Sequence, residues 1–195
     1  VTGEAVTQLT RDIGSALVDL EDEGLLYRDM KLCNILRTFD GTFSLCDFGV
    51  VTRDDNAEAL KKGCGTLGYL SPEEGEAVSM QFAEKDASSV YQKRSDWFPL
   101  GIIFYEMVTC SVFIGVEKYK GEAVKKRFSY WHSNMQAFVQ RYPEMVAKRQ
   151  VLVVDDEGNF SPCVFRMEAS RLIELFPDVR ERAAFIDFVL GLLNP

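Results

Sequence analysis

The stretch YRDMKLCN, residues 27–34, places an arginine, an aspartate, a lysine and an asparagine close together in what reads as a loop. Just before it, residues 4–22 carry apolar side chains at helical spacing, which predicts an amphipathic helix that ends near Gly24. The apolar positions of this helix are Val6, Leu9, Ile13, Leu17 and Leu20. Just after the loop, Asp40-Gly41 fits a hairpin turn between two short β-type runs, ILRTF and TFSLC. We therefore expect the polar loop to lie between a helix and a hairpin.

The rest of the chain reads mostly as helix. Residues 95–108 are apolar on nearly every side and predict a buried helix, and residues 122–149 predict one or two more. The segment 150–160 reads as a strand pair, or as one strand and a turn, and residues 183–193 mark a last helix. The predicted fold class is therefore α+β, mostly α, with short β-hairpins.

Composition excludes several classes of protein. A net charge of −8 and a pI near 4.8 argue against a nucleic-acid partner, which would need a basic face. No run approaches the roughly 18 apolar residues of a membrane span, so we expect no membrane partner. The five cysteines are scattered and His132 is the single histidine, a pattern that favours reduced thiols in a cytoplasmic, intracellular protein over a zinc site or disulfides.

Three further stretches follow the loop in a fixed order. DFG occupies residues 47–49, thirteen positions after Asn34, and GTLGYLSPE occupies residues 65–73. DWFPLGIIFYEM, residues 96–107, forms most of the predicted buried helix. Together with residues 27–34, these stretches resemble the motifs of the protein kinase family, H/Y-R-D-x-K-x-x-N, D-F-G and G-T-x-x-Y-x-x-P-E, and its central helix.

The resemblance covers essentially the whole chain and implies one domain, residues 1–195. It would be the large (C-terminal) lobe of an eukaryotic-type serine/threonine protein kinase, of the AGC or calmodulin-dependent kind. In it, residues 27–34 would be the catalytic loop, residues 47–73 the activation segment and residues 95–108 the central helix. No Gly-rich loop and no V-A-I-K lysine occur in the sequence, so the small N-terminal lobe is expected to be absent and both ends look cut from a longer protein.

The resemblance also assigns roles. Asp29 would orient the acceptor hydroxyl, and Lys31 would neutralise charge on the γ-phosphate of ATP. Asn34 and Asp47 would be the metal ligands, since carboxylate and amide oxygens suit Mg²⁺. ATP and Mg²⁺ are thus the expected cofactors.

The remaining expected site residues fall into three groups. The nucleotide would be contacted by Lys31, Cys33, Asn34, Leu36, Cys46 and Asp47. Regulatory or structural roles would belong to Tyr27, Arg28, Phe48, Gly49, Thr66, Glu73 and Asp96. A protein substrate would dock on Leu67, Gly68, Tyr69, Leu70 and Glu106.

The glycines of GCGTLG, residues 63–68, also spell G-x-G-x-x-G, a phosphate-binding pattern. Such a loop should follow a strand and lie well upstream of the catalytic loop, whereas this one follows DFG. We interpret it as part of the activation segment, where glycine relieves backbone crowding and Thr66 would bond to Asp29 and Lys31.

Substrate class and activity are less constrained. Lys31 favours serine/threonine substrates, and Glu106 favours basic residues near the acceptor, although Cys33 stands where a second acidic contact is usual. The chain alone is expected to be inactive, needing an N-terminal lobe in cis. The alternatives are a pseudokinase or free lobe that serves as a non-catalytic interaction module, and a small-molecule kinase.

Two departures from the family pattern bear on regulation. Arg28 in such kinases commonly meets a loop phosphate, yet EALKKGC before Gly65 has no hydroxyl residue, so Asp54, Asp55 or Glu58 is a hypothetical substitute for that phosphate. In the family, the glutamate at the position of Glu73 pairs with an arginine that follows the final Asn-Pro, and the given sequence ends at that proline, Pro195. Extra residues in 74–95 and 117–165 are read either as partner-docking segments or as divergent loops.

Overall fold

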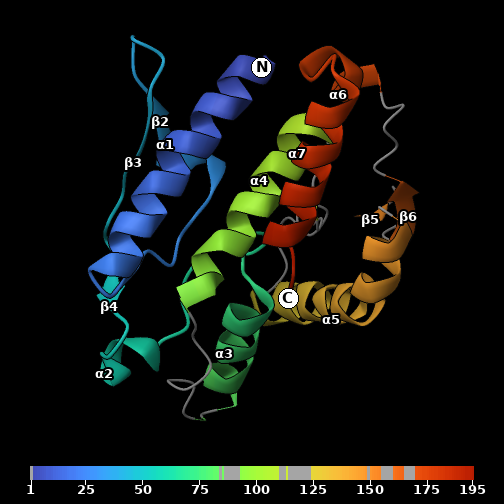
Figure 1. Ribbon diagram of the computed structural model, residues 1–195. Helices are drawn as coiled ribbons and strands as arrows, with labels where there is room; N and C mark the ends of the chain where they lie inside the picture. The colour runs from blue at the N-terminus through green and yellow to red at the C-terminus, as the bar shows by residue number, and fades with distance from the viewer. Residues whose placement is uncertain are drawn as a thin grey trace. The chain divides into compact units, whose positions relative to one another are not determined.

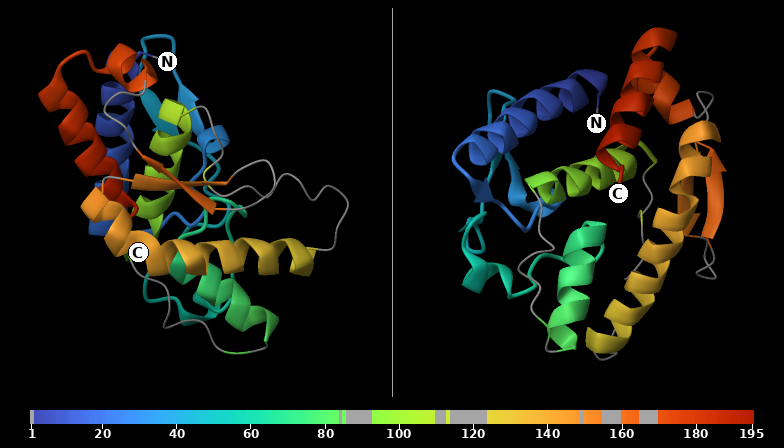
Figure 2. Two further views of the ribbon diagram at one scale, coloured as in Figure 1. Left: turned by 90° about the vertical axis from the view of Figure 1, so that its right-hand side faces the viewer. Right: turned by 60° about the horizontal axis from the view of Figure 1, so that its bottom comes forward.

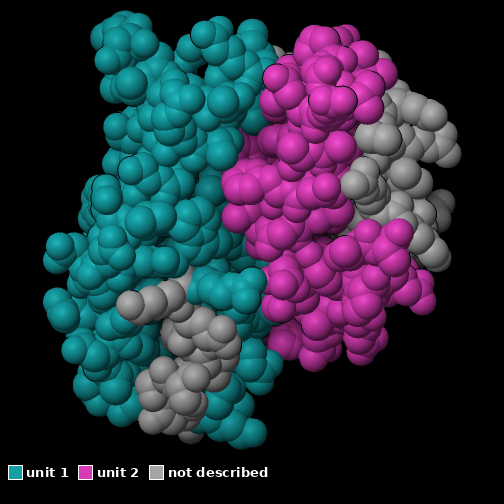
Figure 3. Space-filling model, viewed as in Figure 1, with its two compact units in different colours: residues 1–100 teal, residues 101–195 magenta. Residues whose placement is uncertain are grey.

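The computed structural model describes residues 2–83, 85, 93–109, 113, 124–148, 150–154, 160–164 and 170–195. The chain divides into two compact units, Val1–Leu100 and Gly101–Pro195 (Figure 3). Helices dominate and the strands are short, in agreement with the predicted α+β, mostly α class.

The first unit begins with helix α1, Gly3–Asp22. Thr2 caps its N-terminus by accepting a hydrogen bond from the N–H of Ala5 at 3.2 Å. The predicted apolar face is buried at Val6, Leu9, Ile13 and Leu17, and Gly24, with φ of +66°, follows the helix. The helical periodicity of residues 4–22 is therefore confirmed.

Strands β2 (Ile35–Arg37) and β3 (Phe43–Leu45) form the predicted hairpin beside α1 (Figure 1). Their antiparallel register pairs Ile35 with Leu45, and Gly41 takes the positive φ (+92°) that the turn requires. The N–H of Phe43 donates to Asp12 Oδ2 of α1 at 2.8 Å, which ties the hairpin to the helix.

A second strand pair was not predicted. Strands β1 (Leu25–Leu26) and β4 (Thr52–Arg53) are antiparallel and join the start of the polar loop to the segment after DFG. The one-turn helix α2, Ala57–Leu60, follows.

Helix α3, Pro72–Phe82, was also not predicted. Ser71 and Glu74 form a capping box at its start, in which Ser71 N donates to Glu74 Oε2 at 2.8 Å and Glu74 N donates to Ser71 Oγ at 3.2 Å. Pro72 occupies the first helical position, where its missing N–H costs nothing. These signals fix where the glycine-containing segment ends and the helix begins.

The apolar helix α4 spans Trp97–Thr109, and the unit boundary falls within it. Residues 95 and 96, predicted to be helical, belong instead to a 3₁₀ turn η2, Lys93–Asp96. Every residue from Leu100 to Tyr105 is buried, as the near-continuous apolar pattern predicted.

The second unit contains α5 (Val124–Lys148), β5 (Gln150–Val154), β6 (Phe160–Val164), α6 (Ser170–Leu175) and α7 (Val179–Leu192). The described part of the predicted helical segment 122–149 is thus one helix, α5, with Pro143 inside it, and strands β5 and β6 form an antiparallel pair that lies beside the end of α5 (Figure 2). Aromatic pairs such as Phe104–Phe185 and Phe113–Phe138 fill the core of this unit. Parts of the extra segments 74–95 and 117–165 lie outside the described residues.

Among the described helices, none combines the length and the apolar character that crossing a lipid bilayer demands.

Candidate active site

Three side chains of the first unit, those of Lys31, Thr66 and Asn34, converge on Asp29. Lys31 Nζ lies 2.6 Å from Asp29 Oδ2, and Thr66 Oγ1 donates to Asp29 Oδ1 at 2.7 Å. Lys31 Nζ also donates to Thr66 Oγ1 at 2.9 Å, which closes a ring of three polar groups. Asn34 Nδ2 donates to the Asp29 carbonyl at 2.9 Å and approaches Oδ2 at 3.2 Å. The Asp29 carboxylate is therefore oriented from several sides.

Charge within this cluster is balanced locally. The hydrogen bond to Asp29 raises the pKa of Lys31, and partial burial of the ammonium opposes this effect. Both side chains keep some exposure, 19% for Lys31 and 14% for Asp29. The pair is thus shielded from bulk water yet open to a ligand.

Asp96 fixes the backbone of the loop by hydrogen bonds. Its carboxylate accepts the N–H groups of Tyr27 and Arg28, each at 2.7 Å. Burial raises the pKa of Asp96 to about 6, while the two N–H donors and the Arg28 charge oppose the shift. Because Arg28 has φ of +71°, the loop turns sharply at this point and aims Asp29 toward Lys31 and Thr66.

Tyr27 connects the loop to DFG. Its ring meets Phe48 edge-on with centroids 5.7 Å apart, and its hydroxyl donates to the Cys46 carbonyl. Burial of the phenol is the main cause that raises the pKa of Tyr27 to about 12, so it stays protonated. Phe48 itself remains 55% exposed.

The hairpin brings Asn34 and Asp47 to one end of the site. Cys46 N donates to the Asn34 carbonyl at 2.9 Å, so Asp47 follows directly on the residue paired with Asn34. Asp47 has φ of +60°, which aspartate tolerates, and Gly49 N donates weakly to its Oδ1 at 3.3 Å. One exposed carboxylate and one amide oxygen are a hard-oxygen donor set that fits Mg²⁺ completed by phosphate and water oxygens. Among the described residues, no group of three or more His, Cys, Asp or Glu gathers to bind a metal by itself.

The backbone conformation and close packing of residues 63–68 explain why glycines stand there. Tyr69 N donates to the Thr66 carbonyl at 3.0 Å, with Gly68 at φ of +103°, as position three of a type II turn requires. Gly65 also has φ of +103°, and a Cβ there would lie 2.6 Å from Leu70 Cδ2. A Cβ on Gly63 would meet Val78 Cγ2 of α3 at 2.7 Å. These glycines let the segment pass close to α3 and to the loop.

The other expected site residues are placed less closely together. Cys33 is exposed, with Sγ 3.9 Å from Asn34 Oδ1, and Leu36 on β2 is 53% exposed. Glu73 Oε2 is buried and has no hydrogen-bond partner among the residues that the structure describes. Glu106 belongs to the second unit, where its Oε1 accepts the N–H of Phe113 at 3.3 Å.

Glu74 is a buried acid that motif reading missed. It is 2% exposed, and burial together with the charge of Asp96 raises its pKa well above the usual range. The Ser-x-x-Glu capping pattern of residues 71–74 was the available signal, because it predicts that the Glu74 carboxyl turns back to the helix start.

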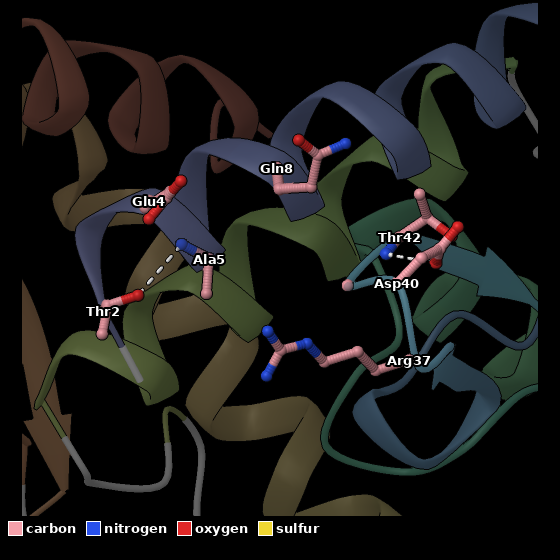
Figure 4. A pocket seen from close by; sticks show the side chains of 8 residues that line it. Thr2, Glu4, Ala5, Gln8, Arg37, Asp40 and Thr42 are labelled. Atoms are coloured by element: carbon pink, nitrogen blue, oxygen red, sulfur yellow. Dashed lines mark hydrogen bonds between the residues drawn. The ribbon is translucent and has the colours of Figure 1, made fainter.

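A separate pocket of about 290 Å³ lies between the first turns of α1 and the β2–β3 hairpin (Figure 4). It is lined by Thr2, Glu4, Ala5, Gln8, Arg37, Asp40, Gly41 and Thr42. It shares no residue with the Asp29 cluster and is therefore not part of the candidate active site.

Comparison with known proteins agrees with this geometry. The protein kinase domain family matches residues 1–189, and the chain belongs to that family. Relatives include the serine/threonine-protein kinase AtPK2/AtPK19 of Arabidopsis thaliana, 33% identical over 51% of this chain and 19% of that protein. Serine/threonine-protein kinase YPK1 of Saccharomyces cerevisiae is 33% identical over 61% of this chain and 15% of its own length.

A third relative is protein kinase C eta type of Homo sapiens, 34% identical over 50% of this chain and 13% of that protein. The matched part thus spans less than a fifth of each of these relatives. The predicted membership of the eukaryotic serine/threonine kinase family is confirmed.

Proposed function

We propose that this chain is the large lobe of a protein serine/threonine kinase that transfers the γ-phosphate of ATP to a protein hydroxyl. The observation that carries the proposal is the closed network in which Lys31, Thr66 and Asn34 all bond to Asp29. A structural salt bridge would need only one partner, whereas phosphoryl transfer needs an oriented base beside a cation.

The residues divide the work by their chemistry. The Asp29 carboxylate accepts the proton of the attacking hydroxyl, and its orientation is set by Thr66 and by the Asn34 amide. Lys31 supplies a fixed positive charge beside Asp29, where negative charge develops on the transferred group. Asn34 and Asp47 would hold Mg²⁺, and the ion would supply positive charge to the phosphate oxygens of bound ATP.

The kinase proposal also implies a substrate, a cellular compartment and a requirement for a further lobe. Residues 67–70 dock the protein substrate near the acceptor, and Glu106 favours basic residues in it. The protein acts in the reducing cytoplasm, and the chain alone is inactive because an N-terminal lobe in cis must complete the ATP site.

The test uses the protein expressed at its natural length. Asp47→Asn weakens ATP binding in the presence of Mg²⁺ at least tenfold, about 1.4 kcal/mol, and leaves binding without Mg²⁺ unchanged. Asp55→Asn is the matched control, because Asp55 is exposed, pairs with Arg53 at 3.5 Å and is not one of the expected metal ligands. Equal effects of the two substitutions would refute the metal role of Asp47.

A non-catalytic interaction module is the second candidate. It is favoured by two large apolar side chains beside the site, Leu36 and Phe48, which are each more than half exposed and offer a surface for another protein. Asp29→Asn separates the two functions. Under the kinase proposal it lowers kcat by roughly 10²–10⁴ with ATP binding intact, and under the alternative it changes nothing that the protein does.

A further inference from the structure

Residues 62–66, within the expected activation segment 47–73, lie directly against the expected catalytic loop. Arg28 Nη2 donates to the carbonyl oxygen of Lys62. Cys64 Sγ lies 3.9 Å from the Arg28 carbonyl, and Thr66 Oγ1 donates to Asp29. Three successive contacts in five residues thus hold the segment against the loop, and two of them involve Arg28.

Arg28 is a rigid anchor for this contact. The residue is only 5% exposed, and its N–H is fixed by Asp96 at 2.7 Å. A buried guanidinium placed in this way keeps its donors in a fixed direction. Its bond to Lys62 goes to a main-chain oxygen, which is present whatever side chain stands at that position.

Helix α3 also contacts the backbone of residues 62–66. The ideal Cβ of Gly63 would lie 2.8 Å from Gln81 Oε1 and 3.0 Å from Val78 Cα, so the backbone of residue 63 touches α3. Any displacement of the Lys62 carbonyl away from Arg28 would therefore require this backbone to leave α3 as well.

The segment contains few residues that could be phosphorylated. Between Phe48 and Gly65, Thr52 is the one Ser, Thr or Tyr in the sequence. Thr52 is 9% exposed and lies in β4, paired with Leu26, so another kinase would have to open that strand pair to reach it. Asp55 and Glu58, two of the acids considered as substitutes for a phosphate, form ion pairs with Arg53 and Lys61 of their own segment.

We propose that Arg28 docks the activation segment through the Lys62 carbonyl, so that the docked conformation needs no phosphate on the segment. The inference rests on the proposed function, because the docked conformation is the one that a protein substrate would meet. Arg28 acts in it as a positioning residue.

The test follows amide hydrogen exchange of residues 63–66 in the natural-length protein, before and after phosphatase treatment. We expect the same protection, within twofold, in both samples, and no phosphate on residues 48–66 by mass spectrometry. Arg28→Gln raises the exchange rate of these amides at least tenfold. Lys62→Ala is the matched control and leaves exchange unchanged, because the carbonyl acceptor remains.

Gly63→Ala provides a second route if Arg28→Gln fails to fold. It displaces the Lys62 carbonyl while Arg28 stays in place, and we expect the same tenfold rise. Loss of protection after phosphatase treatment, or an equal effect of Lys62→Ala and Arg28→Gln, would overturn the proposal.

Kinetics then separate this inference from the catalytic proposal. Arg28→Gln raises KM for a protein substrate at least fivefold and leaves KM for ATP unchanged, which a general loss of structure would not do. If exchange behaves as expected but the protein transfers no phosphate under any condition, the docking inference stands and the proposed function fails.

Discussion

Gly65→Ala tests whether the glycine stretch is required by the backbone. Gly65 has φ of +103°, outside the conformations that alanine adopts readily, and this costs about 1–2 kcal/mol. The added Cβ would lie 2.6 Å from Leu70 Cδ2 and 3.0 Å from the Arg28 carbonyl, and relief of such crowding costs roughly 1–3 kcal/mol. Lower entropy of the unfolded chain returns about 0.4–1 kcal/mol. We expect a net loss of about 1–5 kcal/mol.

The assay is urea unfolding followed by far-UV circular dichroism, with Gly14→Ala as the control. Gly14 lies inside α1, and a Cβ there would meet Trp97 Cζ3 at an ordinary 4.0 Å. This substitution should stabilise the protein by about 0.5–1 kcal/mol, as alanine does within a helix. If Gly65→Ala were as stable as the wild type, the reasoning about this backbone would be refuted.

Two further predictions concern the buried acids. Burial raises the pKa of Asp96 from 3.8 to about 6, so the folded state binds more protons than the unfolded state between these values. The stability that Asp96 contributes therefore falls as pH rises from about 4 to 6, by roughly 2–3 kcal/mol. Urea titrations should show a steeper fall in stability over this pH range for the wild type than for Asp96→Asn, which keeps only the contribution of other groups such as Glu74, and parallel curves would contradict the prediction. Glu74→Gln keeps an acceptor for Ser71 N and removes the ionisable group. Because the pKa of Glu74 is raised, we expect Glu74→Gln to be at least as stable as the wild type at pH 7. Glu74→Ala loses the cap and should cost about 1 kcal/mol or more, and equal losses for Gln and Ala would exclude a neutral Glu74.

The sequence predicted elements whose signals are local. Helix α1 and the β2–β3 hairpin were predicted because the apolar spacing of residues 4–22 and the Asp40-Gly41 turn each act within a few residues. Strands β1 and β4 were missed because two-residue strands have no periodicity, and Leu26 pairs with Thr52 across a long separation. Helix α3 was missed although Ser71, Pro72 and Glu74 indicate a helix start, because the glycines before it favoured the prediction of a loop.

The candidate site was predicted from order and spacing rather than from periodicity. Residue types and spacing marked an aspartate, a lysine and oxygen-bearing side chains in the loop and at DFG, and the roles that the resemblance assigned to them stay predictions. The sequence did not show that Arg28 would donate to a main-chain oxygen, because every residue carries the same carbonyl group and residue types cannot mark which one is the acceptor. The burial of Glu74 beside Asp96 likewise depends on how α3 and η2 pack in three dimensions.

Asp96 forms its hydrogen bonds to the loop of residues 27–34 through the main-chain N–H groups of residues 27 and 28. A substitution at Tyr27 leaves both hydrogen bonds available, whereas any change that removes the Asp96 carboxylate weakens or removes both together. Tolerance of these two hydrogen bonds to substitution is therefore uneven: the side chain at Tyr27 can change without removing them, while Asp96, 69 positions away in the sequence, cannot be replaced without weakening or removing them.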